Sequence, residues 1–333
     1  MKNKIKVIQY GLGPIGLKIT KYISERNSIE IVGAIDISSE KVGKSLKDLA
    51  EINTDLNVKI SSNAKEIFES TKADAVILTT TSSLEKIRPQ VLEILSYKLN
   101  IISTCEELTH PWLTNSKIAN EIDEAAKKNN VSVLATGVNP GFLMDFLPMS
   151  LTALCKDVKK VTVERIQNAQ FRRLPFQQKI GAGLTPEQFQ KKKQDGTLRH
   201  VGLTESVNMI ASRLGWTLDK TEDIIEPVIA SENTSAGELL IEKGNALGVK
   251  QIGKGIKNGE EIISLVFVAA VGQKDPRDRV IIEGTPNIDT TIKGGVNGDI
   301  ATCAITVNAI PTTINAKAGL RTMDDIEPIS CWV

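Results

Sequence analysis

One glycine-rich segment near the N-terminus, Gly11-Leu12-Gly13-Pro14-Ile15-Gly16, limits the folds open to this chain more than any other feature. It follows an apolar run at residues 5–10 and opens into a stretch whose apolar residues have helical spacing. A second apolar run at residues 29–35 ends in Asp36, twenty positions after Gly16. The order strand, glycine turn, helix, strand and acid is typical of a dinucleotide-binding βαβ unit, so a parallel sheet is predicted to begin here.

The parts of this unit have separate physical roles. The first glycine permits a tight turn, the second lets the backbone approach a pyrophosphate, and the third lets helix and strand pack closely. The helix N-terminus offers N–H groups and a partial positive charge to the phosphates. Asp36 can accept hydrogen bonds from an adenosine ribose and would repel a 2′-phosphate, which predicts NAD as the cofactor. NADP is the alternative, because Ser38, a further expected cofactor contact, and Lys41 follow closely and can soften that preference.

Composition places few further limits on the chain. Its 333 residues suffice for two domains, and a net charge of +1 gives no electrostatic reason to expect nucleic acid or an anionic membrane as a partner. The longest apolar run, Leu265–Val271, is too short to cross a bilayer. Four cysteines lack paired metal-ligand spacing, so we expect reduced thiols, no metal site and a cytoplasmic protein.

The rhythm of the predicted elements changes about midway along the chain. Strands at 58–60, 73–78, 100–104 and 131–135 alternate with helices that begin near Asn63 and Ser82 and with a helix at 118–128. Beyond residue 155, strands at 158–166, 224–230, 262–271 and 279–284 follow with one helix, at 204–214, among them. An apolar helix at 302–310 is predicted to end at Pro311.

These patterns predict an α/β protein of two domains. Residues 1–150 should form a Rossmann domain, a doubly wound parallel sheet. Residues 151–298 should form a second α+β domain on a mainly antiparallel sheet, since consecutive strands there lack intervening helices. Residues 299–333 should return to the Rossmann domain.

The loops beyond the carboxyl ends of the strands are the candidate sites, because ligands of such sheets bind there. Thr79, Thr80 and Thr81 are expected along the nicotinamide ribose, although ordinary helix capping explains them equally well. Asn139 and Pro140 form a rigid turn that can cover the nicotinamide ring or hold its carboxamide. A simple turn between domains is the alternative for that segment.

Two adjacent carboxylates, Glu106 and Glu107, follow the strand at 100–104. Ionising both is disfavoured beside a negatively charged cofactor, so one of them is suited to proton transfer near neutral pH. The alternative is that Glu107 caps the following segment and Glu106 faces water. His110 is expected at the surface nearby.

Basic residues of the second domain are candidates to receive a substrate carboxylate. We select Arg172, Arg173 and His200 from a polar stretch that also holds Lys179 and Arg199. Basic surface loops that serve only solubility are the alternative explanation.

Four longer motifs resemble one known family. They are Ser103–Trp112 (STCEELTHPW), Ala135–Asp145 (ATGVNPGFLMD), Gln178–Pro186 (QKIGAGLTP) and Ala318–Asp324 (AGLRTMD). They resemble the 2,4-diaminopentanoate dehydrogenases, which belong with the native amine dehydrogenases to a wider group similar to dihydrodipicolinate reductase. The first two motifs are the more specific, and the resemblance spans nearly the whole chain. It implies a homodimer, with the second domain serving both substrate binding and dimerisation.

The resemblance also implies a reaction. The 4-amino group of 2,4-diaminopentanoate would be oxidised with NAD or NADP to give 2-amino-4-oxopentanoate and ammonia, a step of anaerobic ornithine breakdown that is reversible as reductive amination. In related amine dehydrogenases a glutamate of this loop handles the amine and the attacking water. That role carries over to Glu106, with Glu107 as the second choice because the motif holds two glutamates in a row.

Two other functions stay open on the sequence. One is a broader amine dehydrogenase that acts on 4-oxopentanoate or simple ketones with ammonia. The other is a regulatory protein that binds NAD(H) without turnover.

Overall fold

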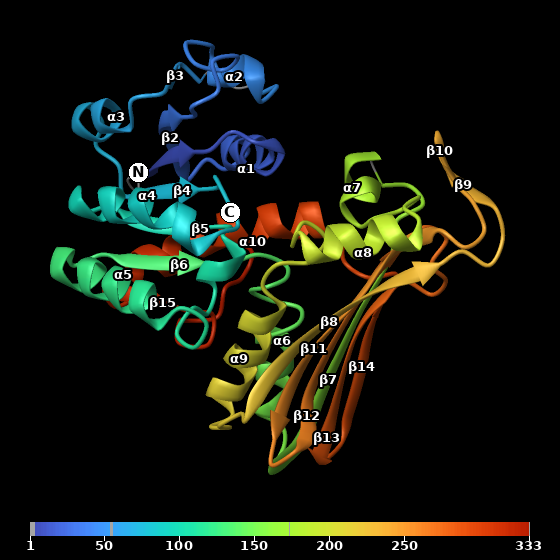
Figure 1. The fold of residues 1–333 in the computed structure, drawn as a ribbon. Coiled ribbons are helices and arrows are strands. Elements are labelled where there is room, and N and C mark those ends of the chain that lie inside the picture. Colours follow the sequence, from blue (N-terminus) through green and yellow to red (C-terminus); the bar gives the residue numbers. More distant parts are fainter. Residues whose placement is uncertain (1–3, 54–55, 173, 333) are drawn as a thin grey trace. The chain divides into compact units, whose positions relative to one another are not determined.

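The computed structural model describes residues 4–53, 56–172 and 174–332. The chain forms two compact units (Figure 1). Unit 1 holds the residues up to Phe142 and those from Asn297 onward, and unit 2 comprises Leu143–Val296. No helix of the described residues is long and apolar enough to span a membrane.

Unit 1 is built on a seven-stranded sheet in the order β15-β6-β5-β4-β1-β2-β3, with every pair parallel. Its strands are β1 (Ile5–Tyr10), β2 (Ile29–Ile35), β3 (Ile60–Ser61), β4 (Ala75–Leu78), β5 (Asn100–Ser103), β6 (Ser132–Ala135) and β15 (Gly319–Arg321). The strand order reverses between β1 and β4, the place where such sheets bind ligands. The predicted doubly wound parallel sheet is therefore confirmed.

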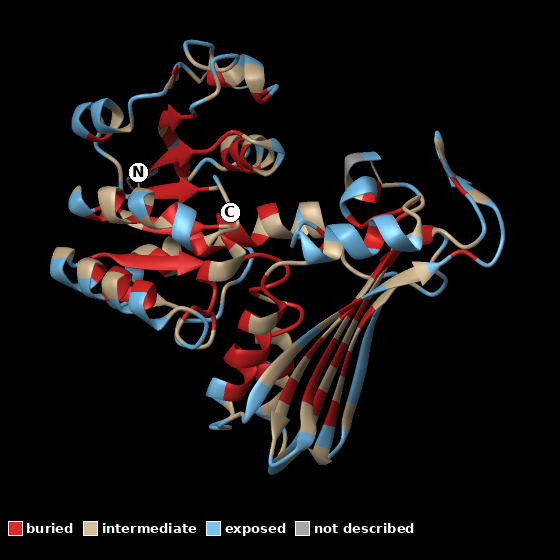
Figure 2. Cartoon of the chain, viewed as in Figure 1, coloured by how far each residue is buried: buried red, intermediate tan, exposed pale blue. Residues whose placement is uncertain are grey.

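The helices of unit 1 explain why its strands are mainly apolar. They are α1 (Pro14–Ser24), α2 (Leu46–Leu49), α3 (Ala64–Ser70), α4 (Leu84–Ser96), the 3₁₀ turn η1 (Glu106–Leu108), α5 (Ser116–Asn129) and α10 (Gly298–Asn315). Strands β4 and β6 are buried along their whole length, as in a sheet covered on both faces (Figure 2).

Three local expectations for unit 1 meet different outcomes. Asn63 caps α3, since its side chain accepts a hydrogen bond from the N–H of Glu66 at 3.2 Å. The helix expected to begin near Ser82 is α4, which begins at Leu84 after Ser83, and its first amide donates to Glu107 rather than to a serine hydroxyl. Pro311 does not end α10, which runs on to Asn315 because buried residues on both sides of the proline hold the helix in the core.

Unit 2 is built on a six-stranded sheet in the order β14-β13-β7-β12-β11-β8. Its strands are β7 (Asp157–Asn168), β8 (Lys220–Ile229), β11 (Ala246–Lys257), β12 (Glu260–Ala270), β13 (Arg277–Thr285) and β14 (Ile288–Lys293), with a separate hairpin of β9 (Thr234–Ala236) and β10 (Leu239–Ile241). Among the described residues of this sheet, β7 and β12 alone pair in parallel, so the mainly antiparallel second sheet is confirmed.

Strand β11 was not predicted from the sequence. Its glycines and lysines are residue types that strands disfavour. The structure gives the reason for the glycines. Helix α9 (Leu203–Arg213) packs so closely on this strand that a Cβ on Gly253 would lie 2.9 Å from Cγ of Leu203. The other helices of unit 2 are α6 (Phe146–Thr152), α7 (Leu174–Lys179) and α8 (Pro186–Gln194).

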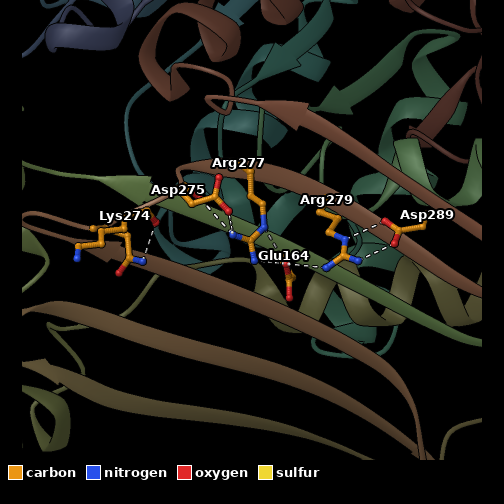
Figure 3. A network of polar contacts seen from close by, with 7 residues as sticks. Glu164, Lys274, Asp275, Arg277, Arg279 and Asp289 are labelled. Atoms are coloured by element: carbon orange, nitrogen blue, oxygen red, sulfur yellow. Dashed lines mark hydrogen bonds and ion pairs between the residues drawn. The ribbon is translucent and has the colours of Figure 1, made fainter.

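The two faces of the second sheet differ in character. On the face that α9 covers, Arg165 is buried and pairs with Asp278 at 2.7 Å. The opposite face carries an ionic network in which Glu164 accepts from Arg277 at 2.8 Å, and Arg279 pairs with Asp289 (Figure 3). Between these charges lie half-buried apolar residues, which are Ile166, Ile252, Val266, Val268 and Ile281.

Candidate active site

The glycine turn after β1 has the geometry that a dinucleotide requires. Gly11 has a φ of +93°, and a Cβ there would lie 2.7 Å from the carbonyl oxygen of Thr79. A Cβ on Gly16 would collide with the carbonyl oxygen of Gly11, whereas one on Gly13 would meet open space. The first and third glycines therefore close the turn, and the second leaves its surface accessible.

The N-terminus of α1 is suited to an anion. Gly13 is the capping residue and Pro14 opens the helix. No side chain caps this end, and its first turn contains no acidic residue. The partial positive charge of the helix end is thus left for a ligand, and Gly13 and Ile15 are only half-buried.

Asp36 follows β2 and is tied to the glycine turn. Its Oδ2 accepts from the N–H of Leu12 at 2.7 Å and from Nζ of Lys41 at 3.1 Å, and its Oδ1 accepts from the N–H of Ser38 at 2.9 Å. Burial by itself would raise the pKa of Asp36, but the two N–H groups and the ammonium together hold that pKa below its ordinary value. Asp36 is therefore a carboxylate fixed beside the expected adenosine ribose.

The threonines after β4 have distinct contacts. Oγ1 of Thr79 donates to the carbonyl oxygen of Gly11 at 2.8 Å, which joins this loop to the glycine turn. Thr80 donates to Gln90 on α4, and Thr81 accepts from the N–H of Ser83. The structure thus brings both Thr79 and Thr80 to the glycine turn, since a Cβ on Gly11 would lie 3.0 Å from Cγ2 of Thr80. Thr81 lies just before the start of α4.

The two glutamates after β5, Glu106 and Glu107, differ in their hydrogen-bond partners. Both are half-buried on η1. Oε2 of Glu107 accepts from the N–H of Leu84 at 2.9 Å, so Glu107 caps α4, a helix that precedes it in the chain. The backbone carbonyl of Glu106 accepts from the hydroxyl of Thr109, which holds the turn that presents its side chain.

His110 differs from the expectation of a surface histidine. Only 3% of its surface is exposed, and Asp324 of the C-terminal segment lies close enough to act on its charge. Desolvation lowers the pKa of His110, and the negative charge of Asp324 opposes part of that effect. Asn139 and Pro140 follow β6 and are buried, joined by a cis peptide bond.

The expected substrate residues lie in unit 2. The guanidinium of Arg172 lies 4.0 Å from the ring centroid of Phe176, and Arg173 is outside the described residues. The His200 ring stacks on Phe267 with centroids 4.6 Å apart. The side chain of Gln251 binds the His200 backbone on both sides: Oε1 accepts from the N–H at 2.6 Å, and Nε2 donates to the carbonyl at 3.0 Å.

Gln9 was missed by the sequence reasoning. It is fully buried on β1, and its Nε2 donates both to the Gly11 carbonyl and to Oγ1 of Thr79, each at 3.0 Å. A polar residue inside an apolar strand, two positions before the first glycine, was the available signal.

Comparison with known proteins places the chain in a family. A family described as the 2,4-diaminopentanoate dehydrogenase C-terminal domain matches residues 142–333. The chain is 34% identical over 331 residues to a 2,4-diaminopentanoate dehydrogenase of Acetoanaerobium sticklandii, covering 97% of this chain and 94% of that protein.

Two solved structures share the fold. An amine dehydrogenase from Mycobacterium smegmatis superposes with a TM-score of 0.85 at 22% identity, covering 99% of this chain and 98% of that one. The WlbA dehydrogenase from Bordetella pertussis, in complex with NADH and UDP-GlcNAcA, superposes with a TM-score of 0.54 at 14% identity, covering 93% and 88%. Since the sequence match extends over nearly the whole of both chains, this chain belongs to the 2,4-diaminopentanoate dehydrogenase family.

Proposed function

We propose that this protein catalyses the NAD(P)-dependent oxidative deamination of the 4-amino group of 2,4-diaminopentanoate. The products are 2-amino-4-oxopentanoate, ammonium and reduced cofactor, and the reverse reaction is a reductive amination. The observation that carries this proposal is the position of η1, the turn after β5 that holds Glu106 and Glu107. It lies at the same carboxyl edge of the sheet as the glycine turn, whose geometry suits a dinucleotide. The relative from Acetoanaerobium sticklandii bears the name of this activity.

The residues present fit NAD. The uncapped N-terminus of α1 and the open surface at Gly13 suit the pyrophosphate, and Asp36 suits the ribose hydroxyls. Thr79, Asn139 and Pro140 would line the nicotinamide half, since they follow β4 and β6 at the same edge. When bound, NAD accepts a hydride from the carbon that carries the amine.

Glu106 would manage the protons of this reaction. The substrate amine is an ammonium at neutral pH and must lose a proton before its lone pair can form the C=N bond. Glu106 accepts that proton and passes it to solvent, and the restored carboxylate then accepts a proton from the water molecule that adds to the iminium carbon. The protonated Glu106 returns this proton to the departing nitrogen. Addition of water and loss of ammonia yield the ketone, so one water is consumed and one proton is released to solvent. Glu107 stays at the N-terminus of α4.

Arg172 and His200 would receive the substrate carboxylate. A guanidinium held over an aromatic ring and a stacked imidazole are both preorganised for an anion. Arg173, which stands beside Arg172 in the sequence, is the further candidate.

A panel assay combined with a matched pair of variants tests the function. NAD or NADP would be mixed with 2,4-diaminopentanoate, ornithine, aspartate, or 4-oxopentanoate plus ammonia, while absorbance of the reduced cofactor is followed. We expect turnover with 2,4-diaminopentanoate, and a fall of about 100-fold or more in kcat for Glu106→Gln with NADH binding retained. Glu107→Gln keeps an acceptor for Leu84 and should lose far less.

The outcomes separate the alternatives. Higher turnover of 4-oxopentanoate with ammonia would indicate a broader amine dehydrogenase. NADH binding without turnover of any amine would indicate a regulatory protein. Unchanged kcat in Glu106→Gln would remove the proton-transfer role from that residue.

We also infer that the protein is a cytoplasmic homodimer. The four cysteines are free thiols, in keeping with a reducing compartment. The face of the second sheet opposite α9, with its half-buried aliphatic residues between paired charges, is the surface on which a second copy would dock.

A further inference from the structure

Gln9 is a buried polar side chain for which the reaction has no evident use. A buried side-chain amide is costly in a sheet unless it is hydrogen-bonded. Both acceptors of its Nε2 belong to the expected cofactor loops, since this group donates to the Gly11 carbonyl and to Oγ1 of Thr79 at 3.0 Å each. Gln9 therefore joins the loop after β1 to the loop after β4 from inside the sheet.

The Gly11 carbonyl receives two donors. Oγ1 of Thr79 donates to it at 2.8 Å, in addition to Nε2 of Gln9. Gly11 has a φ of +93°, and glycine in that region can adopt several peptide orientations at little cost. The two donors select one of those orientations, with the carbonyl directed toward the sheet.

The opposite side of the same peptide reaches the acid of the ribose site. The N–H of Leu12 donates to Oδ2 of Asp36 at 2.7 Å. Because the Gly11 carbonyl and the Leu12 N–H belong to one planar peptide, they can only turn together. A rotation that released Gln9 would also withdraw the N–H from Asp36 and turn the carbonyl dipole toward its carboxylate.

We propose that Gln9 is a positioning residue for the cofactor. Acting through the Gly11–Leu12 peptide, it fixes the Asp36 carboxylate and so sets the preference for NAD over NADP. The inference rests on the proposed function for the identity of the ligand. It differs from that function in assigning cofactor discrimination to a side chain that would not touch the cofactor.

The variant Gln9→Met tests the inference, because methionine matches the length of glutamine and has no donor. We expect the Kd for NADH to rise about tenfold and the NAD-to-NADP ratio of kcat/KM to fall by about as much. The KM for the amine and kcat at saturating NAD should stay within about twofold. The same substitution at Gln273, whose Nε2 donates to the Lys274 carbonyl in unit 2, is the matched control and should change neither quantity.

A second pair of variants acts on the same carbonyl. Thr79→Val removes its other donor and should shift the NAD-to-NADP ratio in the same direction, whereas Thr79→Ser keeps the hydroxyl and should retain the ratio. The double variant Gln9→Met/Thr79→Val should lose less than the product of the single losses, because both act on one peptide. This pair also decides the question if Gln9→Met fails to fold.

Two results would overturn the inference. One is a folded Gln9→Met protein with an unaltered NAD-to-NADP ratio, even if its Tm is lower, since that would indicate a purely structural residue. The other is equal ratios in Thr79→Val and Thr79→Ser. Failure of the unaltered protein to bind NADH would instead overturn the proposed function, and the inference with it.

Discussion

At the scale of single residues, the hydrogen-bond donors around each carboxylate of the site distinguish the roles of these otherwise similar groups. Glu106 and Glu107 are adjacent and chemically identical, yet only Glu107 accepts from the first amide of α4. Asp36 is likewise distinguished from an ordinary surface acid by three donors on its two oxygens. Identity of a side chain therefore says less about its role than the donors that surround it.

The lowered pKa of Asp36 predicts a stability that depends on pH. Its folded pKa lies below the unfolded one, so its contacts stabilise unit 1 above about pH 4 and are lost as the pH falls through the folded value. Urea unfolding of the protein and of Asp36→Asn should differ at pH 7, with the difference shrinking toward pH 3.5. A difference independent of pH would contradict this account. Lys18→Gln, on α1, serves as the control for a simple change of charge.

At the scale of elements, helix α4 is completed by a residue from another segment. Its own capping residue, Ser83, makes no side-chain cap bond, and the carboxylate of Glu107 accepts from Leu84 instead. The loop after β5 and the start of α4 thus stabilise each other. A substitution of Glu107 should therefore change the stability of the first turn of α4.

Glu107→Ala should weaken the start of α4. Loss of a capping acceptor costs about 1 kcal/mol, so amide exchange at Leu84 should accelerate about fivefold. Hydrogen exchange followed by mass spectrometry would measure this, with the peptide that covers α5 as an internal reference. Exchange at Leu84 equal to that of the unaltered protein would show that Glu107 is not the cap.

At the scale of the whole molecule, each unit has a distinct sheet, and the face of the second sheet opposite α9 is the one that we propose for association. That face carries the charged pairs drawn in Figure 3. Half-buried aliphatic residues lie on the same face, among them Val266 and Ile281. A patch of this kind is typical of an interface between copies of one chain.

A homodimer predicts a specific mass in solution, and the proposed interface predicts which substitution should dissociate the dimer. Light scattering should give twice the chain mass of 36.2 kDa. Val266→Asp would place an acid in the centre of the face and should shift the species to a monomer, because an unpaired charge is costly in an interface. Leu154→Asp, at an exposed leucine elsewhere in unit 2, should leave the mass unchanged. A dimer that survives Val266→Asp would exclude this face.

Much of this protein could be predicted from short-range patterns. Short-range patterns identify the glycine turn, the acid at Asp36 and the strands of unit 1. Each pattern is typical of one backbone conformation. The two-sheet architecture followed from the rhythm of strands and helices. Strand β11 was not predicted, because its glycines are explained by the close packing of α9 on the strand. The residues next to those glycines in the sequence give no sign of that packing.

The sequence by itself determined a dinucleotide fold with an acid at the ribose position and a glutamate pair after the fifth strand. Only the tertiary structure decided which donors surround those acids. Gln9 meets Thr79 across 70 positions, Leu12 meets Asp36 across 24, and Leu84 meets Glu107 across 23. Such contacts depend on how strands align in a sheet, and alignment is a property of the folded chain that no local pattern contains.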